Sequence, residues 1–311
     1  MTANILELAL IIGIALMFPL QCPVRGCQNA LSASSDQLSC DSGHHFDRSK
    51  YGYWSLVQPQ DRKSLNPGDS DSAVLARQRW LSKGHMAGLE TKLRDWIDEL
   101  PLPNASNALQ LLTAVDLGCG EGTFGRALFS RDIPKTVTYD WDFCGIDLSK
   151  RAVRIAARGW PEATWLFANA DRRLPILNDS IDLVLSLFGR RPIQESKRIL
   201  RHGGHCLVAV PGPDDLIELR QLAQQEGQAR SRWEKIVNGF SADGFEVVAR
   251  EQWKSVVELD LETTRDAMAM TYRAVRESQQ KRLQKSLDSK FETDSHLAVT
   301  LSADLMLFRA T

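Results

Sequence analysis

The sequence has almost no net charge, because 38 Lys and Arg residues are balanced by 39 Asp and Glu residues, which leaves -1 over 311 residues. This balance excludes a protein that attracts nucleic acid through a uniformly basic surface, so such a partner would have to be met by a local basic patch. Hydrophobic residues make up 43% and charged residues 25% of the chain, which is ordinary for a globular protein. The length suits one large α/β domain with a small additional module.

Long apolar runs are also scarce. The one candidate, residues 5–20 (ILELALIIGIALMFPL), contains Glu7 and is shorter than the about 20 residues that a membrane-spanning helix needs. No Lys or Arg precedes the run and no small-x-small cleavage site follows it, so a signal peptide is poorly supported. A translation start at Met17 is a third interpretation. We therefore regard residues 1–20 as an apolar leader of uncertain status, and we expect a cytoplasmic protein without a stable membrane partner.

Cysteines are few, and half of them are clustered. Three of the six are scattered through apolar or glycine-rich segments, as is typical of buried thiols in a reducing cytosol: Cys119, Cys144 and Cys206. The other three precede a histidine in the pattern Cys22-x4-Cys27-x12-Cys40-x3-His44. Two pairs of soft or borderline ligands are the set that binds structural zinc, and a segment this short needs such a staple to fold. His45 could replace His44, and three reduced cysteines in a loop region are the alternative.

Beyond residue 110 the pattern alternates between strands and helices. Strands are expected at 111–115, 143–146, 165–168, 181–188, 206–210, 245–249 and 298–308, and helices at 123–130, at 150–158 with Ser149 as N-cap, at 193–200 after Arg191-Pro192, and at 214–224. Helical spacing of apolar residues from Val74 to Leu100 predicts two earlier helices, separated near Lys83-Gly84-His85. The alternation predicts an α/β fold, with a mostly parallel seven-stranded sheet covered on both faces.

A glycine-rich loop, Asp116-Leu117-Gly118-Cys119-Gly120-Glu121-Gly122, follows the first of these strands. A strand that leads through such a loop into a helix builds a ligand pocket at the carboxyl end of the sheet, although glycines alone do not distinguish one nucleotide cofactor from another. Asp116 and Glu121 would oppose a pyrophosphate and suit the cationic cofactor S-adenosylmethionine. Asp147 ends the second strand, where its carboxylate can accept hydrogen bonds from ribose hydroxyls.

These motifs resemble the class I (Rossmann-like) methyltransferases, in which an acid such as Asp171, after the third strand, lies near the adenine. From residue 22 to about 220 the chain more specifically resembles the 23S rRNA guanine-N1-methyltransferases. The matching segments, in family order, are CPVRGCQNAL, CDSGHHFD, KYGYWSL, NPGDS, ALARQRWL-like residues 76–81, LSKGH, VDLGCGEG, GIDLSK, RLPI and PGPDDLIELR. The resemblance implies a zinc-ribbon-like domain at 21–62, a helical linker or cap at 63–110 and a methyltransferase domain at 111–311.

The resemblance also implies specific ligands. Zinc would be held by Cys22, Cys27, Cys40 and His44, and S-adenosylmethionine would be bound by Met86, Asp116, Gly118, Gly120, Glu121, Asp147, Asp171 and Asp215. The chain departs from the family at several of its motifs. The first cysteine pair is two residues longer than CxxC, Met86 and Asp215 replace a tyrosine and a histidine, and residues 187–192 differ from the family's aromatic-Ala-Pro turn.

The expected reaction is methyl transfer from S-adenosylmethionine to N1 of a guanine in a hairpin loop of 23S rRNA, by a monomer or a homodimer. Asp69 is the candidate proton acceptor, with a helix N-cap as its alternative role. RNA would contact a basic set with interleaved aromatics: Arg25, Arg48, Lys50, Arg62, Lys63, Arg77, Arg79 and Lys83, with Tyr51, Tyr53 and Trp54. The alternatives are a methyltransferase for small molecules and a non-catalytic zinc-ribbon protein that binds RNA.

Overall fold

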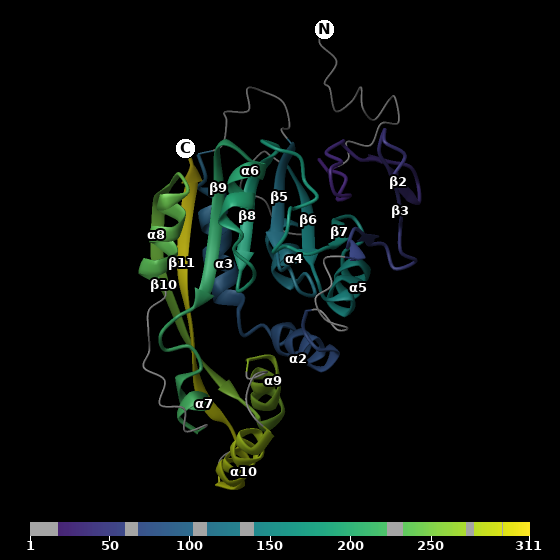
Figure 1. Ribbon diagram of the computed structural model, residues 1–311. Helices are drawn as coiled ribbons and strands as arrows, with labels where there is room; N and C mark the ends of the chain where they lie inside the picture. Colours follow the sequence, from purple (N-terminus) through teal and green to yellow (C-terminus); the bar gives the residue numbers. More distant parts are fainter. Residues whose placement is uncertain are drawn as a thin grey trace.

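The computed structural model describes residues 18–59, 68–101, 111–130, 140–222, 233–271, 277–293 and 295–311. Its centre is a sheet in the order β10-β11-β9-β8-β5-β6-β7-β4 (Figure 1). Five parallel strands form its middle: β5 (Leu111–Leu117), β6 (Asp140–Asp147), β7 (Thr164–Phe167), β8 (Ile181–Leu187) and β9 (Leu200–Pro211). On one side β11 (Leu297–Ala310) runs antiparallel to both β9 and β10 (Phe245–Leu259). This is the predicted, mostly parallel sheet of a class I methyltransferase.

The predicted number of strands was wrong, since the described residues contain eight in this sheet rather than seven. The additional strand is β4 (Trp54–Ser55), which pairs in parallel with β7 at the edge of the sheet. A strand of two residues produces no periodic pattern of its own. No strand was therefore predicted here, and residues 54–55 were assigned to the N-terminal module. Their partners in the sheet, Leu166 and Phe167, lie more than a hundred residues further along the chain.

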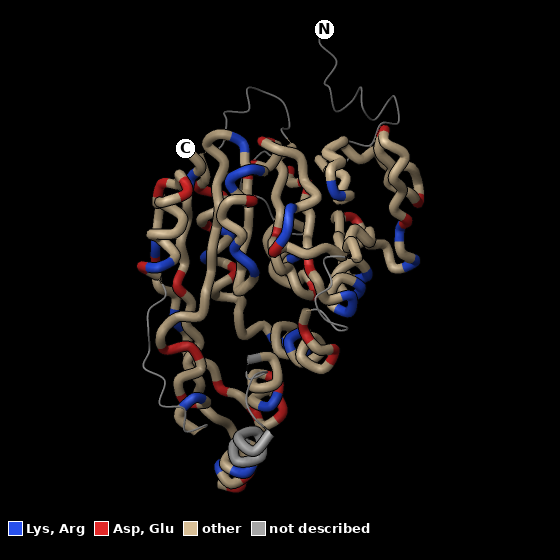
Figure 2. The backbone as a smooth tube through the Cα atoms, viewed as in Figure 1, with Lys and Arg blue, Asp and Glu red and all other residues tan. Residues whose placement is uncertain are grey.

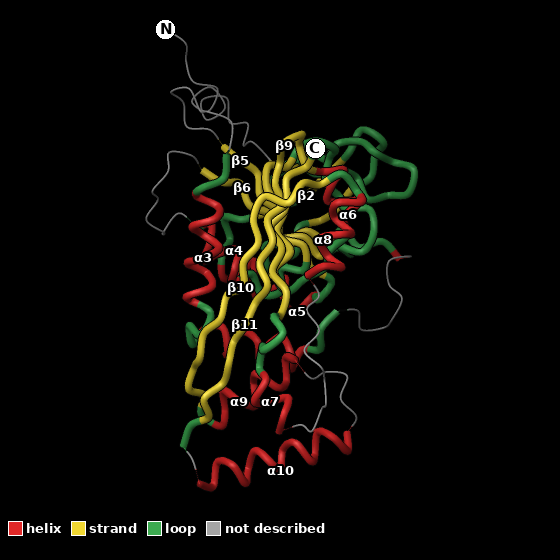
Figure 3. Tube along the Cα trace, turned by 90° about the vertical axis from the view of Figure 1, so that its left-hand side faces the viewer, coloured by secondary structure: helices red, strands yellow, loops and turns green. Residues whose placement is uncertain are grey.

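Helices cover both faces of the sheet (Figure 3). One hydrophobic cluster lies under α3 (Ala87–Asp98), α4 (Thr123–Phe129) and α5 (Lys150–Gly159). A second lies on the opposite face, under α6 (Ile193–Ile199) and α8 (Trp233–Ala242). The predicted break before α3 is confirmed, since α2 (Asp71–Ser82) ends just before Gly84, whose φ of 75° is left-handed. Ser149 caps α5 as predicted, with its side chain accepting a hydrogen bond from the Ala152 amide.

The two C-terminal strands continue past the sheet as a ribbon that carries its own helices (Figure 3). These are α7 (Ile217–Leu222), α9 (Leu261–Thr271) and α10 (Glu277–Thr293), of which only α7 was predicted. A third hydrophobic cluster joins Leu219, Leu259 and Leu287 of this arm to Trp80 and Leu81 of α2. The arm therefore packs on the helix that follows the N-terminal module.

The N-terminal module is a small antiparallel sheet of β1 (Ser32–Ala33), β2 (Gln37–Ser39) and β3 (His45–Asp47). It is fused to the large domain, because its buried leucines share one core cluster with Ile146 and Ile176. The apolar leader lies largely outside the described residues, and of its described part Phe18 and Leu20 are buried in the same cluster. Within the described chain, no helix has the length and apolar character required to span a bilayer.

Candidate active site and metal centre

The glycine loop after β5 is shaped by close backbone approaches. Gly118, with φ of 84°, brings the chain so near to the β8–α6 turn that a Cβ would lie 3.1 Å from Gly189 Cα. Gly122, with φ of 79°, packs on a core tryptophan, and a Cβ there would lie 2.4 Å from the Trp165 ring. Only glycine combines a left-handed backbone with such contacts. The loop is thereby held open against the carboxyl ends of β5 and β8.

Buried carboxylates surround this loop. Asp116 is 2% exposed, and burial together with the charges of Asp147 and Glu121 raises its pKa to about 8. Its Oδ1 has no hydrogen-bond partner within the described part of the chain. A buried acceptor without a donor, beside two further acids, fits a cationic ligand that carries N–H groups. The residues present therefore fit S-adenosylmethionine.

Asp147 lies at the edge of the loop, and its carboxylate accepts two hydrogen bonds from backbone amides. Its Oδ2 accepts a hydrogen bond from the Gly120 amide at 3.0 Å, and its Oδ1 accepts one from the Ser149 amide at 2.7 Å. Burial raises the pKa of this carboxyl, while the two amides act in the opposite direction. Because a carboxylate oxygen has capacity for more than one donor, Asp147 can also receive ribose hydroxyls.

Arg77 on α2 bridges the loop to the turn that follows the N-terminal module. Its Nη1 donates to Asp69 Oδ2 at 2.6 Å and its Nε donates to Glu121 Oε2 at 2.8 Å. The two carboxylates raise the pKa of the Arg77 guanidinium. The alternative N-cap role of Asp69 was wrong, since Ser70 caps α2 by accepting a hydrogen bond from the Ala73 amide at 3.2 Å.

A cavity opens over the loop between α2, the β8–α6 turn and the C-terminal arm. Five of the predicted cofactor residues line it, namely Met86, Gly118, Gly120, Glu121 and Asp215. Asp171, by contrast, is on the surface, with its carboxylate 3.4 Å from Arg190 Nε. The sequence interpretation missed the remaining walls, which come mostly from distant segments and include Arg77, Trp80, Phe188, Leu216, Met270 and Leu301, with Phe124 from the helix that follows the loop. We call this cavity the cofactor pocket.

Two features of the pocket bear on chemistry. Phe188, at the end of β8, has a positive φ of 57° and is 37% exposed, which is uncommon for a bulky residue and typical of functional turns. Its ring lies 6.0 Å from that of Phe124. Asp215, which also lines the pocket, accepts a hydrogen bond from the Ser302 amide, and burial raises its pKa to about 6.

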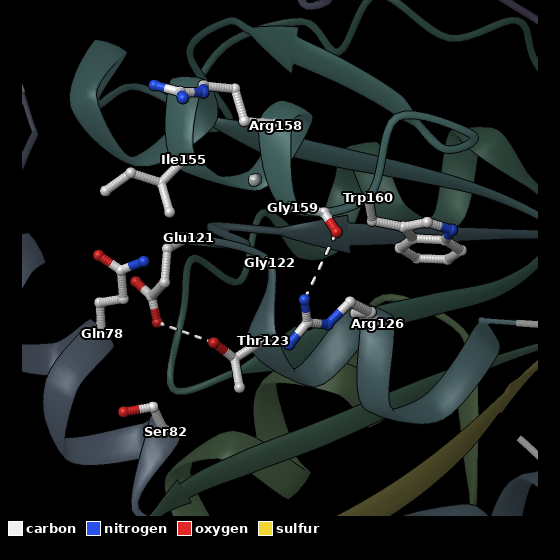
Figure 4. A pocket seen from close by; sticks show the side chains of 11 residues that line it. Gln78, Ser82, Glu121, Gly122, Thr123, Arg126, Ile155, Arg158, Gly159 and Trp160 are labelled. Carbon is white, nitrogen blue, oxygen red and sulfur yellow. Dashed lines mark hydrogen bonds between the residues drawn. The ribbon is translucent and has the colours of Figure 1, made fainter. Parts of the chain in front are cut away.

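A second cavity lies against the other side of the same loop and shares Glu121 and Thr123 with the cofactor pocket (Figure 4). Its walls come from α2, α4 and α5, and Figure 4 shows its polar side chains, among them Gln78, Ser82, Arg126 and Arg158. Arg126 Nη1 donates to the Gly159 carbonyl at 3.4 Å. We call this the α5 cavity.

The four predicted zinc ligands lie together in the N-terminal module, with their ligand atoms all within 4.8 Å of one another. Nδ1 of His44 is 3.5 Å from Cys22 Sγ and 3.4 Å from Cys40 Sγ, and the Cys27 and Cys40 sulfurs are 3.9 Å apart. Tetrahedral zinc with these ligands requires separations of about 3.5 Å, so the set fits the metal. His45 lies outside this group, on β3. Hydrogen bonding from the Asn29 amide lowers the pKa of Cys27, whereas burial raises the pKa of Cys22.

The predicted RNA-contacting set is only partly available. Arg77 lies in the cofactor pocket, while Arg79 and Lys83 form ion pairs with Asp266 and Asp260 on the C-terminal arm. The stacking role of two aromatics was also wrong, because Tyr53 is 3% exposed and Trp54 8%. Arg62 and Lys63 lie outside the described residues. Of the predicted cations, Arg25, Arg48 and Lys50 are exposed.

Comparison with known proteins identifies two family models along the chain. The model described as RlmA, N-terminal, a zinc ribbon, matches residues 20–65, and the model described as Methyltransferase domain matches residues 114–204. The 23S rRNA (guanine(748)-N(1))-methyltransferase of Streptomyces fradiae is 31% identical over 259 residues, which cover 81% of this chain and 84% of that protein. "Putative 23S rRNA (guanine-N(1)-)-methyltransferase YxjB" of Bacillus subtilis (strain 168) is 30% identical, over 68% of this chain and 71% of that protein.

Proposed function

The chain belongs to the family of 23S rRNA guanine-N1-methyltransferases, and we propose that it transfers a methyl group from S-adenosylmethionine to N1 of a guanine in 23S rRNA. The observation that carries this proposal is the likeness to the Streptomyces fradiae enzyme over 81% of this chain, together with family-model matches to the zinc module and to the methyltransferase domain. A methyltransferase for small molecules has no evident need for the metal centre at Cys22, Cys27, Cys40 and His44. We propose 21–62, 63–110 and 111–311 as the functional units of the chain.

The cofactor supplies a methyl group on a positively charged sulfur. The protein has to align the reacting atoms and to compensate the positive charge. Asp116 and Glu121 would compensate the positive charge beside the loop, where Asp116 has an unused buried oxygen. Asp147 would accept hydrogen bonds from the ribose, and Asp171 would lie toward the adenine. Met86 would supply an apolar contact where the family has an aromatic ring, since it lines the cofactor pocket.

We propose that the target guanine stacks on Phe188. Its strained position puts an exposed ring at the pocket wall, beside Phe124. A base can reach that ring only after leaving its own stack, and this costs least in a loop. A hairpin-loop guanine is therefore the proposed substrate. The proposed location is the cytoplasm.

The proton on guanine N1 must be accepted as the methyl group is transferred. Asp69 was the candidate in the sequence, yet its carboxylate is already bound to Arg77 at 2.6 Å. Asp215 lines the cofactor pocket, and its pKa of about 6 is closer to neutrality than that of an ordinary aspartate. We therefore propose Asp215 as the proton acceptor and Asp69 as a residue that positions Arg77.

Two substitutions separate these roles. Asp215→Asn should lower kcat/KM by about a hundredfold or more and remove the fall in rate that is expected for the wild type below about pH 6. Asp69→Asn should leave that acidic limb in place. If Asp215→Asn retains the wild-type pH profile, or if Asp69→Asn alone abolishes the limb, the assignment is wrong.

The activity itself is tested with deproteinised 23S rRNA and methyl-labelled cofactor, followed by mapping of the labelled base. The expected product is 1-methylguanine at one position. Label in small acceptors and none in rRNA would favour the small-molecule alternative, and failure to bind S-adenosylmethionine in calorimetry would favour the non-catalytic one. Either result contradicts the proposal.

We also propose that the enzyme forms a homodimer through β10. This strand lies at the edge of the sheet and exposes Val248 and Val256, at 46% and 62%. An unprotected edge strand with exposed apolar side chains is a site for pairing with another chain. Light scattering should give twice the monomer mass, and Val256→Lys should return the protein to a monomer; a monomeric wild type would contradict the proposal.

A further inference from the structure

Helix α5 carries an unusually uniform charge. No acidic residue occurs between Asp147 and Glu162, while Lys150, Arg151, Arg154 and Arg158 all belong to the helix. At about 100° per residue these four lie within a stripe of roughly 100° on the helix surface. The opposite side is apolar and buried, with Ala152, Val153, Ala156 and Ala157 facing the sheet. The cations therefore lie together on the outer side of α5, and Figure 2 marks basic residues along this part of the backbone.

The N-terminal module extends this stripe. Its loop between β3 and β4 packs on α5, since a Cβ at Gly52 would lie 3.9 Å from Ala157. The Arg154 guanidinium lies 3.7 Å from the centre of the Tyr51 ring, and Lys50 Nζ lies 5.3 Å from it. Stacking on one aromatic ring thus joins cations from both modules. We call the combined set the α5 surface: Arg48, Lys50, Lys150, Arg151, Arg154 and Arg158.

The cations of the α5 surface share a lack of acidic partners among the described residues. Several other exposed cations are paired with carboxylates, as in Lys254–Asp214, Arg265–Asp288 and Arg309–Glu246. No member of the α5 surface forms an ion pair with a described residue, and Arg151 Nε is buried without a hydrogen-bond partner there. In a chain whose net charge is -1, this concentration of unpaired cations favours a polyanionic ligand.

The position of the α5 surface connects it to the reacting site. Arg158 lines the α5 cavity, whose wall residues Glu121 and Thr123 also line the cofactor pocket. The other end of α5 adjoins the turn that carries Asp69, because a Cβ at Gly68 would lie 2.9 Å from the Ser149 amide nitrogen. A strand of nucleic acid that follows α5 would therefore run beside the loop that binds the cofactor.

Resting on the proposed function, we infer that the α5 surface binds the sugar–phosphate backbone of the rRNA and sets how the target loop is presented to the cofactor pocket. Arg48 and Lys50 place one part of the RNA on the zinc module, and α5 guides the backbone toward the glycine loop. The zinc module contributes to this surface by presenting a loop rather than by reading bases with Tyr53 and Trp54, which are buried. Contacts to phosphates orient RNA without selecting its sequence.

The test is the salt dependence of rRNA binding by the full-length, zinc-loaded protein. Lys150→Gln and Arg158→Gln are combined, because both side chains are exposed and neither forms an ion pair with a described residue. Arg265→Gln combined with Arg309→Gln is the matched control, with the same change in net charge at exposed, paired positions. Binding to deproteinised 23S rRNA is measured from 50 to 200 mM salt, roughly the range over which phosphate contacts are lost.

Each phosphate contact contributes about 0.7 to 0.9 to the slope of log K against log salt, so the α5 double variant should have a slope shallower by about 1.5. Over this fourfold change in salt, wild type should lose about eightfold more affinity than the variant. Affinity for S-adenosylmethionine, measured by calorimetry, should be unchanged, and the control pair should retain the wild-type slope. An unchanged slope in the α5 variant, or an equal loss in the control pair, would overturn the inference.

The same measurements distinguish failure of the α5 surface from failure of the proposed function. If wild type methylates rRNA while the α5 variant binds it with the wild-type slope, only the α5 surface is wrong. If wild type neither methylates nor binds rRNA, the proposed function fails as well. Methylation by wild type together with the shallower slope supports both.

Discussion

Replacing Arg77 by methionine should separate the glycine loop from the turn behind the zinc module. Arg77 binds Asp69 at 2.6 Å and Glu121 at 2.8 Å, and the Glu121 side chain is only 3% exposed, whereas those of Arg77 and Asp69 are each 23% exposed. Removing one partner of a buried ion pair destabilises by about 3–5 kcal/mol, because the other charge is left without compensation. The more exposed pair with Asp69 should contribute about 1 kcal/mol or less. We therefore expect Arg77→Met to lower the free energy of unfolding by about 3 kcal/mol.

The assay is urea unfolding of the zinc-loaded protein without cofactor, followed by tryptophan fluorescence. Neutralising the second partner should restore part of the loss, so Arg77→Met with Glu121→Gln should be more stable than Arg77→Met alone, with a coupling energy of about 2 kcal/mol. Arg265→Met is the control, since its pair with Asp288 is about half exposed and should contribute at most about 1 kcal/mol. A coupling energy below about 0.5 kcal/mol would show that the bridge does not hold the loop.

Further predictions concern the metal, the buried acid and the loop. His44→Gln should release zinc in a colorimetric assay while His45→Gln retains it, because only His44 lies among the cysteine sulfurs; equal retention would contradict the ligand assignment. Asp116 ionises in the unfolded chain at its ordinary pKa but at about 8 in the native state, so ionisation should weaken the native state progressively from about pH 4 to pH 8. Asp116→Asn should therefore gain stability over wild type in thermal melts as pH rises to 8, yet bind S-adenosylmethionine more weakly; a constant difference in stability would argue against a raised pKa. Gly122→Ala should be more destabilising than Gly203→Ala, by about 1–3 kcal/mol. Both glycines have a positive φ, but only a Cβ at Gly122 would lie 2.4 Å from a core tryptophan. Equal losses of stability in urea unfolding would contradict the packing argument.

The parallel sheet could be predicted because its strands are buried on both faces. Such strands appear as short apolar runs, and the first two of them lead into a turn at an acid, Asp116 and Asp147. The cofactor loop could also be predicted, because its residues are consecutive in the sequence. The four zinc ligands also form a local pattern, and the structure brings them together within one small module.

What the sequence did not reveal depends on contacts between distant segments. Arg77 appears as one cation among several on α2, and its partner Glu121 is 44 residues away. The same holds for Arg79 and Asp266, which are 187 residues apart. Local patterns determine which face of a helix is polar, whereas the choice of ionic partner depends on which helix packs there. A basic surface can therefore be located only after the paired cations have been identified.

The cations of the α5 surface come from both modules, and this gives the zinc module a role in forming that surface. Its metal centre, its β4 strand and its loop on α5 are parts of one folded unit, since Cys22, Trp54 and Leu166 belong to one core cluster. If the α5 surface binds RNA as proposed, zinc would affect RNA binding without touching RNA, by fixing the loop that carries Arg48 and Lys50 against α5. Loss of the metal should act on the same phosphate contacts as loss of the α5 cations, because both break the surface that spans the two modules. The position of the RNA relative to the cofactor then depends on the junction between the modules rather than on either module alone.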